Sequence, residues 1–459
     1  MIAGYVMSKH PVVENNDELP AQSQLDDIVG LILAEATSQG ASAADAGVSV
    51  ETGLSVTVRL GEVETLEYHR DQALGVTVYF GNCKGSASTS DFNEQAVRES
   101  VQAACDIARY TNEDDCAGLA DAELMAREIP DLDLYHPWGL SAEQAIDRAL
   151  DCENAARELD TRITNSEGAT LSSHVGLRVS GNTHGFAGGY RSSRHSVSCA
   201  VIGEQDGQMQ RDYWYAAARD SGDMSSAADV GRIASERTLR RLGSRSLKTR
   251  EAPVIFAAEL ASGLFGGFIS AVRGGSQYRQ SSFLLDYLGK QVFPEFMHIH
   301  EQPLLKKAMG SAPFDAEGVA TRPRDLIRDG ILESYVLDTY SARKLGMQTT
   351  GNAGGVHNLT IDHGPNDLRG LMKEMDTGLL VTELMGQGVN IVTGDYSRGA
   401  AGFWVEGGEI QYPVDEITIA GNLREMFLNI VDVGNDVDLR GNTRTGSVLV
   451  EKMMIAGNS

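Results

Sequence analysis

The sequence predicts an α+β fold with mostly antiparallel or mixed sheets, flanking helices and a glycine-rich C-terminal module. Three observations support this prediction. The 459 residues are enough for about three domains. Alternating and helically spaced apolar residues occupy separate stretches, without the regular strand and helix alternation of a doubly wound sheet. Fifty glycines against eleven prolines indicate many turns and close backbone approaches.

A first α+β module is predicted at residues 21–120, after a polar segment at residues 1–20 that we expect to be a flexible tail. Apolar residues at helical spacing predict an amphipathic helix near its start: Leu25, Ile28, Val29, Ile32 and Leu33. Alternation over residues 47–89 predicts strands of an antiparallel sheet. Ser90 or Asp91 is placed to cap the helix that follows.

A second α+β module is predicted at residues 130–242. Ser141 and Gln144 have the spacing of a capping box at the start of a helix. Four strand-like runs follow, at residues 162–166, 176–180, 196–202 and 212–217. A helix at residues 227–242, basic towards its end, closes this module.

The third module is predicted at residues 250–459, after a linker at residues 243–252. A short apolar strand leads into a helix at residues 259–272, and Gly274 to Ser276 are predicted to end that helix. Two more helices are predicted at residues 339–345 and 367–375. The module is rich in glycine and contains no cysteine.

Two local signals near the end of the chain are sharper. Gly407 and Gly408 lie between strand-like runs and predict a two-residue hairpin turn that needs positive φ angles. Asn422, with Glu425 three residues later, predicts a capped helix whose apolar face includes Met426 and Phe427.

The composition excludes several classes of function. A formal net charge of −25 opposes binding to nucleic acid, which needs clustered lysine and arginine. No apolar run is long enough for a spanning helix, and the N-terminus lacks the apolar core of a signal peptide. The five cysteines are odd in number and widely spaced, which indicates free thiols in a reducing compartment. We therefore expect a cytoplasmic protein with no membrane partner.

The segment from Asp395 to Arg398 places Asp, Tyr, Ser and Arg side by side, which suggests a catalytic site. However, Ser397 has no GxSxG context and no identifiable histidine base, so we predict turn chemistry and no catalytic residue here. Four residues of this segment are candidates to line a groove or interface: Tyr396, Arg398, Trp404 and Glu406. A core role for Trp404 is the alternative.

His298 and His300 form an HxH pair that would point to one face of a strand, a geometry usable for a metal. No third, distant ligand can be named from the sequence. We therefore interpret the two histidines as polar surface residues.

Several long motifs resemble the PmbA/TldD family, in particular its PmbA (TldE) branch, over nearly the whole chain. The matching runs are GVSVETGLSVTVRLGEVETLE (47–67), NCKGSAS (82–88), ARYT (108–111), APVIF (252–256), SARKLG (341–346), TELMGQG (382–388) and TGDYSRGAAGFWVEGGEIQYPVDEITIAGNL (393–423). The resemblance implies a cytoplasmic metallopeptidase in which a TldD-like subunit pairs with a PmbA-like one. It also brings an older label, modulator of DNA gyrase.

The resemblance also implies where zinc should bind. TldD-like subunits carry HExxxH on the helix that matches residues 259–272, and a cysteine much later in the chain. In this sequence those ligand positions fall near Ser262, Gly267 and Thr445, with Gly263 near the glutamate. Because these residues are not zinc ligands, we expect no metal or other cofactor in this chain and zinc in the TldD-like partner.

The resulting hypothesis is a non-zinc subunit of a heterodimeric peptidase that cleaves unfolded or leader peptides. This chain alone would be inactive, and a homodimer is possible when it is isolated. One alternative is a stand-alone peptide-binding or gyrase-regulating protein. The other is an independent hydrolase that uses the HxH pair or Ser397.

Overall fold

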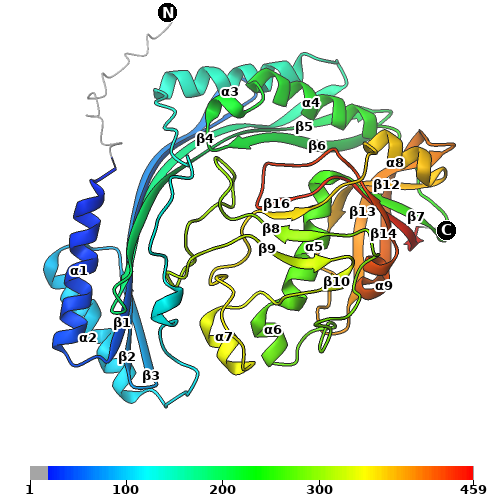
Figure 1. Cartoon of the computed structure of the whole chain (residues 1–459). Coiled ribbons are helices and arrows are strands. Elements are labelled where there is room, and N and C mark those ends of the chain that lie inside the picture. The colour runs from blue at the N-terminus through cyan, green and yellow to red at the C-terminus, as the bar shows by residue number, and fades with distance from the viewer. Residues whose placement is uncertain (1–18, 458–459) are drawn as a thin grey trace, which may run out of the picture.

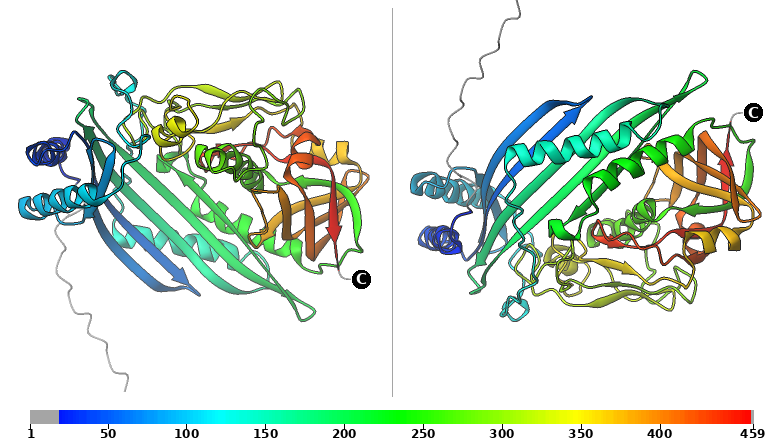
Figure 2. Two further views of the ribbon diagram at one scale, coloured as in Figure 1. Left: turned by 90° about the horizontal axis from the view of Figure 1, so that it is seen from below. Right: turned by 90° about the horizontal axis from the view of Figure 1, so that it is seen from above.

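The computed structural model describes residues 19–457 and has the α+β architecture that the sequence predicts (Figure 1). The flexible tail predicted at residues 1–20 lies almost wholly outside the described residues. A long curved sheet arches around a C-terminal module that contains two further sheets (Figures 1 and 2). In the part of the chain that is described, no helix is long and apolar enough to cross a membrane.

The curved sheet has six antiparallel strands in the order β3-β2-β1-β4-β5-β6. Their bounds are β1 Ala43–Arg59, β2 Glu62–Phe80, β3 Cys83–Thr89, β4 Ile163–Asn182, β5 Ala187–Gln205 and β6 Gln208–Ala218. The runs predicted at residues 162–166 and 176–180 are the two ends of the single strand β4. Since β1 pairs with both β2 and β4, strands from the first and second predicted modules share one sheet.

Four helices cover the convex face of this sheet (Figure 1). They are α1 Gln22–Ser38, α2 Glu94–Tyr110, α3 Ala142–Arg157 and α4 Ala227–Arg241. Two short 3₁₀ helices, η1 Ala122–Leu124 and η2 Ser221–Asp223, occur in the segments between these elements. Alternation decides which residues face them: the even-numbered residues Val48, Val56 and Val58 of β1 pack against the helices. The odd-numbered residues of β1 therefore face the concave side, towards the C-terminal module.

The N-terminal caps of the helices are set by local hydrogen bonds. The Ser141–Gln144 capping box of α3 is confirmed, with both reciprocal hydrogen bonds present. The prediction for α2 was wrong, because Asn93 is its cap and accepts a hydrogen bond from the backbone N–H of Ala96. Asp91 accepts the N–H of Asn93 instead, a local turn that moves the helix start two residues along.

The larger sheet of the C-terminal module has the order β14-β13-β12-β7-β17-β15, and β14 also pairs with β17, so five of its strands form a closed ring. Bounds are β7 Arg250–Phe256, β12 Gly378–Met385, β13 Asp395–Glu406, β14 Glu409–Asn422, β15 Ile430–Val433 and β17 Val448–Ala456. The smaller sheet contains β8 Ile299–Glu301, β9 Arg324–Arg328, β10 Ile331–Leu332, β11 Leu359–Ile361 and β16 Thr443–Arg444. The helices are α5 Ala258–Val272, α6 Gly274–Tyr278, α7 Thr339–Lys344, α8 Leu368–Met375 and α9 Leu423–Leu428.

Two of the three glycine and cap predictions in this module are confirmed. Gly407 and Gly408 have φ angles of +60° and +75° and join the antiparallel pair β13–β14. The side chain of Asn422 caps α9 by accepting the N–H of Arg424.

The third prediction, a glycine helix stop at Gly274, needs correction. Helix α5 ends at Val272, and Gly274 begins the next helix, α6. A side chain at Gly274 would collide with Ser341 on α7, so glycine is needed here for close packing of α6 on α7.

Polar contacts hold the C-terminal module at both ends of the arch. At one end, the Tyr340 hydroxyl on α7 donates to Asp114 at 2.7 Å. At the other, Arg237 of α4 pairs with Glu259 at 2.7 Å, and Arg241 pairs with Glu383 at 2.5 Å. The concave face of the curved sheet is therefore held opposite the C-terminal module.

Candidate functional site

The metal position that the family resemblance indicates lies between α5 and the segment after β16. Thr445 is fully buried, and its hydroxyl donates to the carbonyl of Gly446 at 3.0 Å. Gly267 faces Leu423, whose Cδ1 would lie 3.2 Å from an added Cβ. Ser262, on the same helix, is half-buried. These residues supply none of the side chains that normally hold zinc, so the residues present do not fit that metal.

Tyr396 and Trp404 lie in the core of the C-terminal module, with 4% and 3% of their surface exposed. The Tyr396 ring meets Phe256 edge to face, and burial raises the pKa of its hydroxyl to about 12. The indole N–H of Trp404 donates to Glu406 at 2.8 Å. This burial favours the core role for both aromatic residues, whereas Arg398 is half-buried and Glu406 is exposed.

The turn predicted for Asp395–Arg398 is wrong in position: the turn lies at residues 391–393, and Asp395 begins strand β13, which pairs with β14. Asp395 accepts hydrogen bonds from the hydroxyl of Thr393 at 2.7 Å and from the amide of Asn422 at 3.3 Å. The backbone N–H of Ser397 donates to Gly388 at 2.7 Å. The contacts of Asp395 fix the start of β13 to Thr393 and to Asn422 at the end of β14, so they belong to a strand pair.

His298 and His300 share one face of β8, and their rings stack with centroids 4.7 Å apart. Their interpretation as separate surface residues was incomplete, because Asp362 lies between them, 2.9 Å from His298 and 3.0 Å from His300. The other ring nitrogen of His298 meets Asp325 at 2.8 Å. Burial opposes protonation of His298, but the hydrogen bonds to Asp325 and Asp362 prevail and raise its pKa. This cluster has the character of an ion-pair network.

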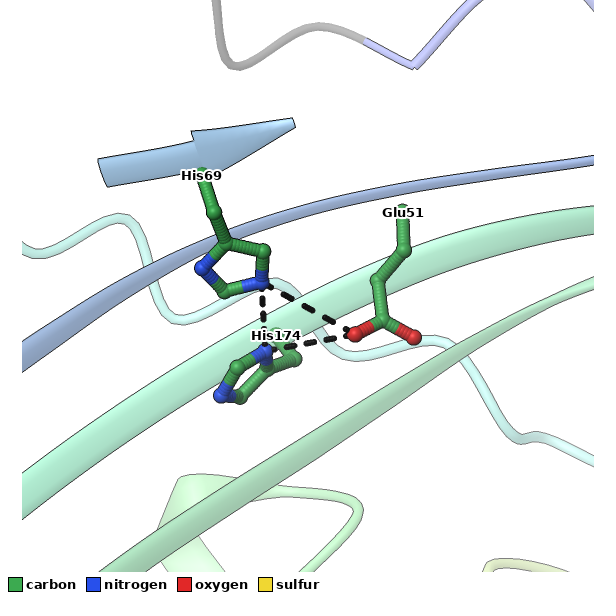
Figure 3. Close-up of side chains that lie close together, drawn as sticks. All are labelled: Glu51, His69 and His174. Atoms are coloured by element: carbon green, nitrogen blue, oxygen red, sulfur yellow. Dashed lines mark hydrogen bonds and ion pairs between the residues drawn. The ribbon is translucent and has the colours of Figure 1, made fainter. Parts of the chain in front are cut away.

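A second cluster, Glu51, His69 and His174, lies on the concave face of the curved sheet (Figure 3). The Nδ1 atom of His174 is 3.0 Å from Nε2 of His69 and 3.3 Å from Oε1 of Glu51. The remaining distance, from Nε2 of His69 to Oε1 of Glu51, is 3.8 Å. Burial and the neighbouring His69 lower the pKa of His174 and favour its neutral form.

The sequence analysis did not find this cluster. His69 and His174 are 105 residues apart and belong to different predicted modules, so only the strand register brings them together. The available signal was indirect: both are polar residues on strands, and each occupies the face opposite the apolar alternation.

The concave face also borders a cavity of about 550 Å³ at the end of the arch near α1 and α2. Hydroxyl groups of Ser49, Thr77 and Ser180 line it, together with Asp45 of β1 and Glu317 of the C-terminal module. Burial raises the pKa of Asp45 to about 6; Lys84 opposes this shift and Glu317 adds to it. Such a polar surface is suited to hydrogen bonding with a ligand rather than to burial of apolar groups.

Three family models match the chain in order, and together they define a protein of the metallopeptidase class. The PmbA/TldA metallopeptidase domain 1 matches residues 44–108, the central domain matches residues 135–242 and the C-terminal domain matches residues 249–457. The chain belongs to the PmbA/TldD family.

Curated relatives agree with this assignment. The chain is 56% identical to Metalloprotease PmbA of Escherichia coli O157:H7 over 93% of its own length and 94% of that protein. It is 49% identical to the Metalloprotease PmbA homolog of Haemophilus influenzae, covering 98% and 100% of the two chains. A Metalloprotease TldD homolog of Buchnera aphidicola is 22% identical over 81% of each chain.

Solved structures share the fold. A candidate modulator of DNA gyrase from Bacteroides thetaiotaomicron superposes with a TM-score of 0.90 at 28% identity, covering 95% of this chain and 99% of that one. A candidate modulator of a DNA gyrase from Thermotoga maritima gives 0.84 at 25% identity, covering 94% and 100%. TldE from Thermococcus kodakarensis superposes with a TM-score of 0.83, covering 94% of this chain and 100% of that one. At 20% sequence identity, this similarity shows a shared fold alone.

Proposed function

We propose that this chain is the subunit without the catalytic zinc in a two-subunit metallopeptidase, paired with a TldD-like subunit that supplies the catalytic zinc ion and the general base. The observation that carries this proposal is the composition of α5 and its surroundings. In a chain of a metallopeptidase family, the ligand positions that the resemblance indicates fall near Ser262, Gly267 and Thr445, and these side chains are not zinc ligands. The chain alone is then inactive, and activity belongs to the pair.

The substrate in this proposal is an unfolded or leader peptide bound in extended form. The curved sheet offers a suitable strand edge at β6, the last strand in its order, which pairs with β5. Within the described chain, β6 therefore has a strand partner on one side alone. An open edge binds a peptide mainly through its backbone, which suits substrates of varied sequence.

The cytoplasm is the proposed compartment, since all five cysteines are free thiols. We propose no nucleic-acid partner because the net charge is −25. The isolated chain can form a homodimer in place of the heterodimer.

A stand-alone regulatory protein is the second candidate. It is favoured by the description of the Bacteroides and Thermotoga relatives as candidate modulators of DNA gyrase. An independent hydrolase that uses His298, His300 or Ser397 ranks third, because Asp325 and Asp362 already engage the HxH pair.

One assay separates the three candidates. The chain is purified alone and together with a TldD-like subunit, and cleavage of an unstructured peptide is measured with and without a chelator. The proposal expects a complex that cleaves the peptide until the chelator is added, and no cleavage by the chain alone. Failure to associate with any TldD-like subunit would favour the regulatory protein, and chelator-resistant cleavage by the chain alone would favour the hydrolase.

A further inference from the structure

We propose that Glu51, His69 and His174 form a binding site for a divalent transition-metal ion, with zinc as the best match, on the concave face of the curved sheet. This site is separate from α5 and does not rest on the proposed function. The expectation that the chain holds no cofactor was based on Ser262, Gly267 and Thr445, which have no part in this cluster.

The distances fit a shared ion. Two atoms bound to zinc at about 2.0–2.1 Å in a tetrahedral arrangement lie roughly 3.3–3.4 Å apart. The three ligand atoms of the cluster are separated by 3.0, 3.3 and 3.8 Å, which brackets that value. Figure 3 shows the two imidazole rings and the carboxylate converging on one point.

Strand register builds the site. Gly53 of β1 is directly opposite His69 of β2 on one side and His174 of β4 on the other. Since neighbouring strands are about 4.8 Å apart, the backbones that carry the two histidines lie about 10 Å apart, and the side chains meet above the central strand β1. Glu51, two residues before Gly53, points to the same face and supplies the third ligand.

Gly53 provides the space in which the two rings meet. A Cβ built on it would fall onto Cε1 of His69 and lie 2.7 Å from Nδ1 of His174. Glycine is otherwise unfavourable inside a strand, because it adds no side-chain packing. Its presence at this position is explained by the imidazole pair that lies across it.

The donor set matches zinc and related ions. Two imidazole nitrogens, which are borderline ligands, and one harder carboxylate oxygen form a set that zinc accepts, and three protein ligands leave a fourth position open. The side chains are 28%, 30% and 56% exposed for His69, His174 and Glu51, so that position is open to solvent. Asp71 is opposite Glu51 on the same face and adds negative charge nearby.

The His298–His300–Asp362 cluster is the weaker candidate for a metal. Both ring nitrogens of His298 already have carboxylate partners, so neither nitrogen is left to face a metal ion. In the Glu51 cluster, by contrast, a nitrogen of each histidine faces the shared point. The His298–His300–Asp362 cluster therefore serves as the internal control.

Titration of the metal-stripped full chain with Zn²⁺, and with Co²⁺ as a spectroscopic probe, tests the proposal. We expect one bound equivalent that is lost in the His69→Asn/His174→Asn variant and kept in the His298→Asn/His300→Asn variant. Glu51→Gln, at an exposed position, should weaken binding by roughly tenfold or more. No binding by the wild type, or unchanged binding by the His69/His174 variant, would overturn the proposal.

A second pair of variants tests the geometry without touching a ligand. Gly53→Ala should abolish the bound equivalent, because its methyl group displaces both rings. Gly75→Ala is the matched control, since nothing lies within 4 Å of a Cβ at that position of the same sheet. Wild-type affinity in Gly53→Ala, with a folded protein by circular dichroism, would contradict the site as described.

Discussion

At the scale of single residues, the central feature is the side chains at the positions where the family resemblance indicates a metal. Ser262 and Gly267 are small, and Thr445 uses its hydroxyl on the neighbouring backbone. Their roles are those of helix packing and a buried turn. A substitution that keeps the packing should therefore leave function unchanged.

Ser262→Ala provides that test. We expect the peptidase activity of the reconstituted pair to change by less than about twofold, which corresponds to about 0.4 kcal/mol in the barrier. Peptide cleavage rates of the pair with wild-type and variant chains give the comparison. A severe loss in a variant that remains folded would refute the packing role of this position.

Asp45 predicts a pH dependence of stability. Its pKa rises from 3.8 to about 6 on folding, so the folded state binds the proton more tightly. Below about pH 4, Asp45 therefore does not lower the free energy of unfolding. Its ionised carboxylate lowers that free energy increasingly as the pH rises to about 6, and by a constant amount at higher pH. Because Asp45 is only half-buried, we expect this cost to be about 1 kcal/mol.

Asp45→Asn should accordingly raise the midpoint of thermal unfolding at pH 7.5 and have little effect at pH 4. Unfolding curves of wild type and variant across this range measure the difference. Ser49→Ala, a neighbour on the same face of β1, is the control. A difference that is the same at both pH values would show that ionisation of Asp45 is not its source.

Sequence reasoning could assess the ligand positions that the family resemblance indicates on α5, because the motif occupies one contiguous helix. It could not find Glu51, His69 and His174 as a group. Alternation assigns each residue to a face of its strand, but register between distant strands depends on the whole sheet. The contact of Asp362 with the HxH pair could not be predicted for the same reason, since Asp362 lies 62 residues after His300.

At the scale of elements, the helix caps at Ser141 and Asn422 were predicted correctly, but the cap of α2 and the extent of the longest strand were not. The middle of β4 reads as serine, threonine, glycine and histidine because its concave side faces polar groups rather than a core. That composition hides the apolar alternation, so a 20-residue strand looks like two short ones.

Contacts between elements also depend on buried polar groups that sequence patterns do not reveal. Glu153 of α3 is fully buried and accepts the backbone N–H groups of Leu60 and Gly61 in the β1–β2 turn, both at 2.8 Å. It links the helix layer to the far end of the first hairpin. Removing it leaves two N–H groups without a partner.

We expect Glu153→Ala to lower the free energy of unfolding by about 2–4 kcal/mol, from the lost hydrogen bonds and the buried space. Chemical denaturation of the purified chain measures this. Asp151→Ala, at an exposed position of the same helix, should change it by less than about 0.5 kcal/mol. Equal effects of the two substitutions would contradict the role assigned to Glu153.

At the scale of the whole molecule, the curved sheet and the C-terminal module form two halves joined at both ends of the arch. The family fold is retained, including α5 and its core, while the ligand positions that the family resemblance indicates fall near residues that are not zinc ligands. This combination is what a subunit would show if it preserved the architecture of an enzyme and left the chemistry to a partner.

The most direct test of the claim that activity belongs to the pair is to measure peptide cleavage by the chain alone, by a TldD-like subunit alone and by the two together, with and without a chelator. We expect strong cleavage by the two together, complete loss on chelation, and none by this chain alone. Cleavage by this chain alone at a rate comparable to that of the pair would contradict the central claim.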